Sequence, residues 1–143
     1  MPNVRHMSEA VLTGGCQCGA VRYAVAAEPL RLYVCHCREC QKQSGSAFGM
    51  SLIVPRAAFA VTQGTARSWL RTADSGRAVA CCFCSACGAR LWHARDGVDT
   101  ISVKAGSLDA PVDFAGAVHI WTSRRLAGVV VPVGAEQYPE EPA

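Results

Sequence analysis

Nine cysteines stand out in this sequence, because seven of them fall into three closely spaced groups. The groups are Cys16 and Cys18; Cys35, Cys37 and Cys40; and Cys84 and Cys87. Zinc in proteins prefers four tetrahedral ligands, and thiolates two or three residues apart can reach one ion. The spacing therefore predicts zinc binding rather than nine unrelated buried thiols.

The two pairs are each half of a four-thiolate site. Glycines flank them in GGCQCG and SACG, and such residues permit the tight backbone path that paired ligands need. We expect Cys16 and Cys18 to join Cys84 and Cys87 in a closed structural site that clips the first strand to the middle of the chain. Spacing alone leaves open whether the last pair joins the first group or the triplet.

The triplet supplies three ligands within six residues. Three protein ligands with an open fourth position are typical of a catalytic zinc, so we expect Cys35, Cys37 and Cys40 to hold a reactive metal. A fourth cysteine could instead close the site, and Cys82 is the candidate. In a strand over Arg77–Phe83, Cys82 points to the same side as Cys84 and Cys81 points to the opposite side.

Composition excludes several classes of protein. The chain has 143 residues, half of them hydrophobic and 17% charged, which predicts one globular domain and not a disordered chain. No apolar run has the ~20 residues of a membrane helix, and the first residues lack a secretory signal. We therefore expect a cytoplasmic, reduced protein without a membrane partner. The formal net charge of +3 is spread out, which argues against nucleic acid.

Short alternating segments predict a mostly-β fold with the cysteines at strand ends. Two helical turns are expected, at Arg38–Ser44 and Pro55–Phe59, and residues 1–12 and 133–143 are expected to form a flexible N-terminal tail and an acidic C-terminal tail. The expected strands are Ala20–Ala26, Leu30–Cys35, Ala47–Val54, Ala66–Arg71, Arg77–Phe83, Arg90–Ala94, Thr100–Ala105 and Ala117–Thr122.

Five ordered motifs resemble the glutathione-dependent formaldehyde-activating enzymes, also called the CENP-V/GFA domain family. They span residues 14–123 and read GGCQCGAVRY, CHCRECQKQSGSAF, FCSACG, GSLD and HIWTS. The resemblance implies a zinc domain over residues 13–132 with a β-tent fold, in which small antiparallel sheets surround the zinc sites. It also implies two zinc ions per chain, one structural on the two pairs and one catalytic on the triplet.

The same resemblance implies a carbon–sulfur lyase of the S-(hydroxymethyl)glutathione synthase type, whose partners are a thiol such as glutathione and an aldehyde. The alternative is a non-catalytic, zinc-stabilised binding module of the same fold. Closure of the triplet by Cys81 or Cys82 would favour the module, and an open cleft would favour the enzyme. A thiol redox sensor at Cys81 and Cys82 is a weaker third hypothesis. The oligomeric state is not predicted.

Five further residues have expected places. Arg38 and Lys42 lie one helical turn apart beside the triplet and could receive the carboxylates of a thiol substrate. His36 lies between two ligands and is expected behind the metal site or at the surface rather than as a ligand, and His119 is expected as a hydrogen-bonded core residue. Trp69 lies on an expected strand, where packing into the core is the default.

Overall fold

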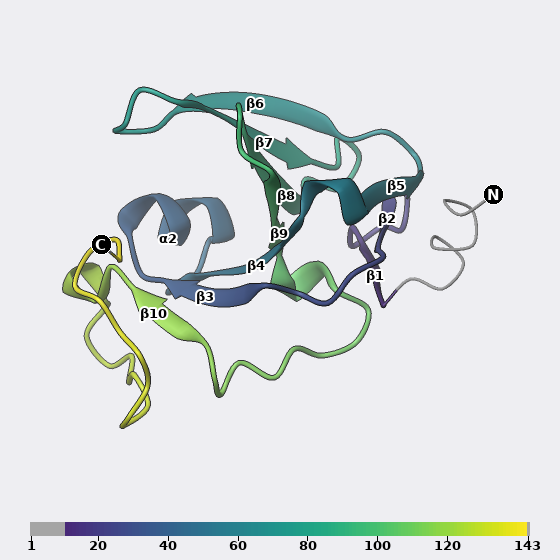
Figure 1. Cartoon of the computed structure of the whole chain (residues 1–143). Helices are drawn as coiled ribbons and strands as arrows, with labels where there is room; N and C mark the ends of the chain where they lie inside the picture. Colours follow the sequence, from purple (N-terminus) through teal and green to yellow (C-terminus); the bar gives the residue numbers. More distant parts are fainter. Residues whose placement is uncertain (1–10, 143) are drawn as a thin grey trace.

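The computed structural model describes residues 11–142, in which ten strands form two sheets (Figure 1). The smaller sheet is antiparallel and has the order β1-β2-β5. Its strands are β1 (Leu12–Gly15), β2 (Arg22–Val25) and β5 (Phe59–Gln63).

The larger sheet has the order β10-β3-β4-β9-β8-β7-β6. Its neighbours pair antiparallel except β10 and β3, which run parallel. The predicted mostly-β class is confirmed. The strands are β3 (Arg31–Cys35), β4 (Gly49–Pro55), β6 (Arg67–Thr72), β7 (Ala78–Phe83), β8 (Arg90–Arg95), β9 (Thr100–Lys104) and β10 (Val118–Ile120).

The short helix α2 (Arg38–Ser44) lies between β3 and β4 on one side and β6 and β7 on the other (Figure 1). Cys37 caps its N-terminus, and Gly45 ends it with φ of 62°, a left-handed conformation that glycine adopts without strain. Single 3₁₀ turns are η1 (Arg56–Ala58), η2 (Ala105–Ser107) and η3 (Thr122–Arg124).

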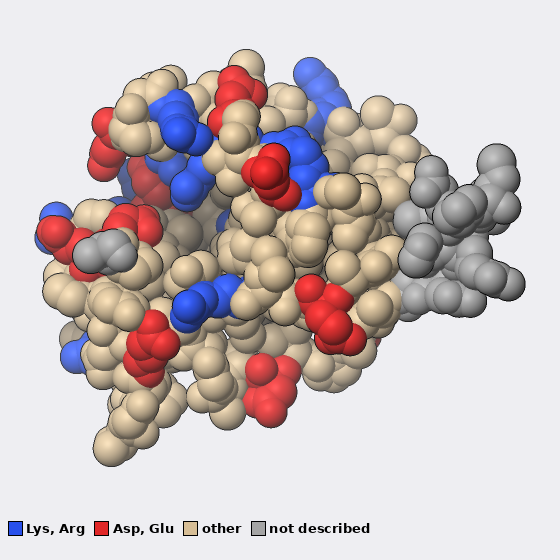
Figure 2. Space-filling view, viewed as in Figure 1, with Lys and Arg blue, Asp and Glu red and all other residues tan. Residues whose placement is uncertain are grey.

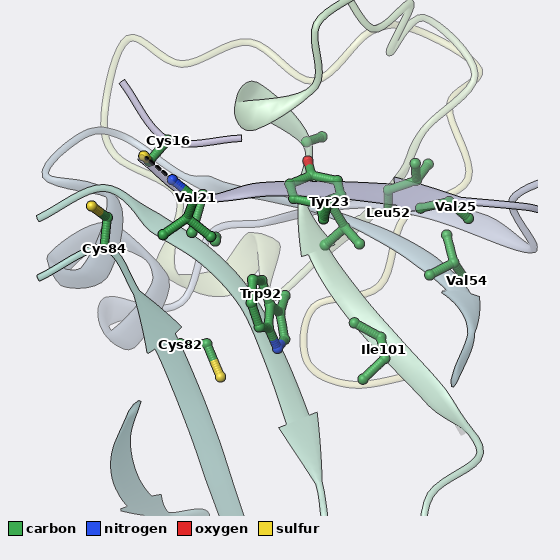
Figure 3. Close-up of a cluster of buried hydrophobic side chains, with 13 residues drawn as sticks. Cys16, Val21, Tyr23, Val25, Leu52, Val54, Cys82, Cys84, Trp92 and Ile101 are labelled. Atoms are coloured by element: carbon green, nitrogen blue, oxygen red, sulfur yellow. Dashed lines mark hydrogen bonds between the residues drawn. The ribbon is translucent and has the colours of Figure 1, made fainter. Parts of the chain in front are cut away.

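The main hydrophobic core lies between the two sheets (Figure 3). Tyr23 of the small sheet is fully buried there and contacts the rings of Phe59 and Trp92, with centroids 5.4 Å and 6.4 Å away. Cys82 and Cys84 belong to the same core, as the alternation of β7 predicts. This packing fixes the small sheet against β7. Cys16 and Cys18 lie between β1 and β2 of the small sheet, and β7 leads directly into Cys84 and Cys87.

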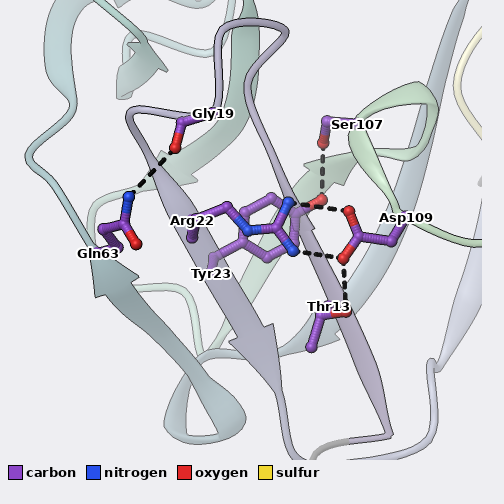
Figure 4. A network of polar contacts seen from close by, with 7 residues as sticks. All are labelled: Thr13, Gly19, Arg22, Tyr23, Gln63, Ser107 and Asp109. Atoms are coloured by element: carbon purple, nitrogen blue, oxygen red, sulfur yellow. Dashed lines mark hydrogen bonds and ion pairs between the residues drawn. The ribbon is translucent and has the colours of Figure 1, made fainter.

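Polar contacts join the small sheet to the loop after β9 (Figure 4). The Arg22 guanidinium donates to both carboxylate oxygens of Asp109, and the Thr13 hydroxyl donates to the same carboxylate at 2.7 Å. The hydroxyls of Tyr23 and Ser107 lie 2.6 Å apart. These residues hold the two sheets together at the edge nearest the paired cysteines.

The expected strands and the helical turn at Arg38–Ser44 are present, and two strands were missed. One is β1, and the other is β5, whose first residue was placed in the turn at Pro55–Phe59. The expected N-terminal tail lies outside the described residues as far as residue 10, and Leu12 already belongs to β1. Within residues 11–142, no helix is long and apolar enough to cross a membrane.

The acidic C-terminal segment lies along β10. The His119 amide donates to the carbonyl of Glu136, and the Tyr138 amide donates to the carbonyl of His119, both at 2.9 Å. Further along, the Trp121 amide donates to the carbonyl of Glu140 at 3.2 Å. The segment therefore covers the outer edge of the large sheet beside β10.

Candidate metal centres and substrate cleft

The two cysteine pairs come together in space, which answers the pairing question that spacing left open. The four sulfur atoms lie within 4.8 Å of one another, contributed by Cys16, Cys18, Cys84 and Cys87. Cys18 Sγ lies 3.6 Å from Cys16 Sγ and 3.7 Å from Cys84 Sγ. Turns with glycine at positive φ, Gly19 after the first pair and Gly88 after the second, bring the sulfurs to this point.

These distances fit zinc. Ligands about 2.3 Å from one tetrahedral ion lie about 3.8 Å from each other, whereas a disulfide would bring two sulfurs to about 2.05 Å. The Val21 amide donates to Cys16 Sγ at 3.2 Å, and this bond lowers the pKa of Cys16 to about 6. The Ala89 amide similarly lowers the pKa of Cys87. Backbone donors thus favour the thiolate form that a metal ligand requires.

The triplet forms a second sulfur group. Cys35 ends β3, Cys37 caps α2 and Cys40 lies in its first turn, and the three sulfurs lie within 4.8 Å of one another. The Cys40 amide donates to Cys37 Sγ at 3.3 Å. Hydrogen bonds from the thiols of Cys35 and Cys40 lower the pKa of Cys37 to about 2. The pKa of Cys35 is raised, first by its hydrogen bond with Cys37 and then by that with Cys40. The donor set is therefore suited to zinc as well.

Within the described residues, no fourth cysteine, histidine or carboxylate joins the triplet. The candidate for closure, Cys82, lies in the main core with Trp92. Cys81 is fully buried and pairs with His93 across the sheet. Residues 11–142 thus hold one four-sulfur group and one three-sulfur group, and both could bind zinc.

A cleft of about 560 Å³ opens onto the triplet between α2 and the concave side of the large sheet. Figure 2 shows Lys and Arg side chains gathered around this hollow. Its walls carry five cationic residues and two carboxylates, those of Glu39 and Glu141. The cations are Lys42, Arg71, Arg90, Arg95 and Lys104. Their excess makes the cleft a suitable place for an anionic ligand.

A β-bulge helps to bring these cations together. Trp92 pairs with Cys82 but Arg90 pairs with Phe83, so Leu91 is an extra residue in β8. The bulge lets Arg90 lie on the same side as His93, and the guanidinium contacts His93 Nε2 at 2.9 Å. The pKa of His93 is lowered to about 2, mainly by burial and further by the charges of Lys104, Arg90 and other nearby cations. This histidine is therefore neutral at physiological pH.

Lys104 is the most enclosed cation on the cleft wall. It is only 9% exposed, and its ammonium donates to Ser51 Oγ at 3.1 Å. Burial lowers its pKa, while the neighbouring Cys40 and Cys35 act in the opposite direction. A buried cation therefore faces the thiolates of the triplet, which gives part of the charge balance that buried ions need.

The other residues expected around the triplet lie partly on the cleft wall and partly away from it. Lys42 lines the cleft, whereas Arg38 is exposed and donates to Gln41 Oε1 at 2.6 Å. His36 is fully buried and not at the surface, and its Nε2 lies 3.0 Å from Nδ1 of His119, which is a buried, hydrogen-bonded residue as expected. Trp69 was expected in the core, but it is 55% exposed on the cleft wall because β6 is an edge strand.

The sequence profile of the family described as "Glutathione-dependent formaldehyde-activating enzyme" matches residues 11–124. The chain belongs to this family. A crystal structure of a Rhodobacter sphaeroides protein is also similar, with a TM-score of 0.55 and 23% sequence identity. The match covers 71% of the present chain and 90% of that one, and it supports the fold.

Membership in the formaldehyde-activating family agrees with the two sulfur groups, which lie inside the matched range. The cations Arg71, Arg90, Arg95 and Lys104 and the neutral His93 were not singled out from the sequence. The only early signal was the two-residue alternation of Trp69 and Arg71 and of His93 and Arg95, which puts each pair on one face of a strand.

Proposed function

We propose that this chain catalyses the reversible joining of a thiol, glutathione or a related compound, to an aldehyde at the triplet. The observation that carries the proposal is the position of Cys35, Cys37 and Cys40 on the wall of a cationic cleft, with no fourth ligand among residues 11–142. Membership in the formaldehyde-activating family supports the same reaction. The class of enzyme would be a carbon–sulfur lyase, named for the reverse direction.

The reaction balances without a redox partner. The thiol sulfur forms a bond to the aldehyde carbon, the carbonyl π bond breaks, and the thiol proton ends on the former carbonyl oxygen. Zinc held by the triplet would favour the thiolate form of the incoming thiol or polarise the aldehyde oxygen. The chain needs only to supply a site that binds both reactants in contact with each other.

The residues of the cleft fit these tasks. Lys104 and Arg90 make the potential near the triplet positive, which favours a thiolate over a thiol. His93 accepts from Arg90 at Nε2, so in the neutral ring the hydrogen remains on Nδ1. This histidine is therefore a neutral donor on the cleft wall and not a base.

The experiment is nuclear magnetic resonance exchange spectroscopy of glutathione and formaldehyde at equilibrium, with and without the zinc-loaded full-length protein. We expect the protein to increase the exchange rate above the uncatalysed rate and Cys40→Ser to abolish the increase. Cys82→Ala, which removes a cysteine outside both sulfur groups, should retain it. Failure of the parent protein to accelerate exchange or to bind glutathione would overturn the proposal and favour the non-catalytic module.

A further inference from the structure

Four cations on the sheet side of the cleft have no carboxylate partner within the described residues, and neither does Lys42 on the helix side. The four on the sheet side are Arg71, Arg90, Arg95 and Lys104. The ion pairs found in residues 11–142 join other groups, Arg22 to Asp109 and Arg31 to Glu136. Unpaired cations that share one concave surface repel one another, and an anionic occupant relieves that repulsion.

The register of the sheet separates these cations into two sets. Lys104 ends β9 beside the triplet, and Arg90 lies next to it at the start of β8. Arg71 and Arg95 lie at the other end, where both pair with Val79, one from each side. Lys104 lies four residues after Thr100, which is at that end, and the two are about 13 Å apart at the rise of a β-strand.

The cations beside the triplet, Lys104 and Arg90, help to balance the negative charge expected of a zinc-loaded triplet. Three thiolates around a divalent zinc ion leave one negative charge, and the buried Lys104 faces those sulfurs. Arg71 and Arg95 lie a cleft's length away from that charge, and guanidinium groups stay protonated at any physiological pH. Their charge is therefore available to a ligand that reaches the far end of the cleft.

The surface between the two sets carries no charge, and its polar residues are the neutral His93 and Ser102. Trp69 lies two residues before Arg71 on the same face of β6, and Ile53 also lines the cleft. These side chains offer a wall for the uncharged middle of an extended ligand. The order along the cleft is thus sulfur group, uncharged wall and paired guanidinium groups.

We propose that Arg71 and Arg95 form an anion subsite that selects thiols carrying a carboxylate remote from the reacting sulfur. The inference rests on the proposed function, because it assumes that the thiol sulfur is placed at the triplet. Two guanidinium groups can share one carboxylate or hold its two oxygens separately, and such charge-assisted hydrogen bonds are directional. Small uncharged thiols cannot use the subsite and should bind weakly.

The test is isothermal titration calorimetry of the zinc-loaded full-length protein with glutathione, glutathione diethyl ester and 2-mercaptoethanol. We expect the Arg71→Gln/Arg95→Gln double variant to bind glutathione about 10- to 100-fold more weakly than the parent. Binding of the diethyl ester, which lacks free carboxylates, should be weak in the parent and unchanged in the double variant.

Arg67→Gln is the matched control, since Arg67 lies on the same strand β6 and is exposed but does not line the cleft. It should bind glutathione like the parent. Circular dichroism and zinc content verify that each variant is folded and loaded. Equal glutathione binding by the parent and the double variant would overturn the subsite and leave the proposed function intact. A parent that binds none of the three thiols would overturn both.

Discussion

Nε2 of His36 lies 3.0 Å from Nδ1 of His119, and the two rings stack with centroids 5.2 Å apart. This buried contact joins the loop that carries the triplet to β10. His36 lies between Cys35 and Cys37, so whatever holds its ring also holds the backbone that presents both sulfurs.

Breaking this contact should destabilise the fold. His119→Ala removes the hydrogen-bond partner of His36 and leaves a cavity, so we expect the free energy of unfolding to fall by about 2 kcal/mol or more. Urea denaturation of the zinc-loaded protein measures the loss. In a double-mutant cycle with His36→Ala, the two losses should be coupled by about 0.5–3 kcal/mol. Strict additivity would show that the contact contributes no stability of its own.

A second prediction concerns Gly49, where β4 passes beneath α2. A methyl group added at this position would lie 2.8 Å from Gln43 Nε2 and 3.2 Å from Cys40 Cβ, so the Gln43 amide would have to turn away and Cys40 would have to move by a few tenths of an ångström. We expect Gly49→Ala to weaken zinc binding at the triplet about 10-fold, as for other changes that displace ligands indirectly. Competition with a chromophoric chelator measures the affinity of each site.

The control for that change is Gly106→Ala, because the added carbon would meet only Met50 Cε at 4.0 Å. It should leave both zinc affinities unchanged. A Gly49→Ala protein with normal affinity at the triplet would show that Cys40 moves without disturbing the position of its sulfur.

The third prediction distinguishes the two sulfur groups by metal analysis. The parent should contain two zinc ions per chain. Cys40→Ser should lose one and keep a cooperative unfolding transition, whereas Cys84→Ser should lose the other and be destabilised by several kcal/mol. The reason is that Cys84 belongs to the group that joins residues far apart in the chain. Equal destabilisation by the two substitutions would contradict this division.

The fourth prediction is a pH dependence that comes from His93. Its pKa is lowered to about 2 in the folded protein, against about 6.5 in an unfolded chain, so acid favours the unfolded state. The contribution of the neutral His93 to the free energy of unfolding is fully present above pH 6.5. It is lost as the pH falls toward 2, by at most about 1.4 kcal/mol per pH unit.

His93→Gln keeps an acceptor for Arg90 and removes the titration. Between pH 6.5 and 5, we expect its free energy of unfolding to fall less steeply than that of the parent in urea denaturation. The pKa values of His36 and His119 are also lowered. Both residues are present in the two proteins, so their contributions to the pH dependence cancel when the two curves are compared. Parallel curves for the two proteins would show that His93 is not desolvated.

The strands that sequence analysis identified are those with strong alternation. β1 was missed because its four residues, LTGG, carry no such pattern, and pairing with β2 decides its conformation. β5 was missed because it begins directly after the turn η1, so Phe59 was assigned to the turn. In β1, contacts with a distant segment of the chain override weak local preference.

The cysteine groups were visible because ligand spacing is a local property of the chain. The cationic cleft was not, since Arg71, Arg90, Arg95 and Lys104 are brought together only by the register of β6 to β9 and by the bulge at Leu91. A bulge moves Arg90 to the other face of its strand, and nothing in the residue pattern marks its position.

The parallel pairing of β10 with β3 sets an order of events during synthesis. The three sulfurs of the triplet emerge within six residues, but Cys35 pairs with Ile120, which is made much later. A growing chain can therefore present the triplet to metal before the wall beside it exists. Pairings between distant segments also form slowly. We therefore expect the three sulfurs to come together before the cleft forms. The last strand, β10, then completes the wall beside a sulfur group that is already assembled.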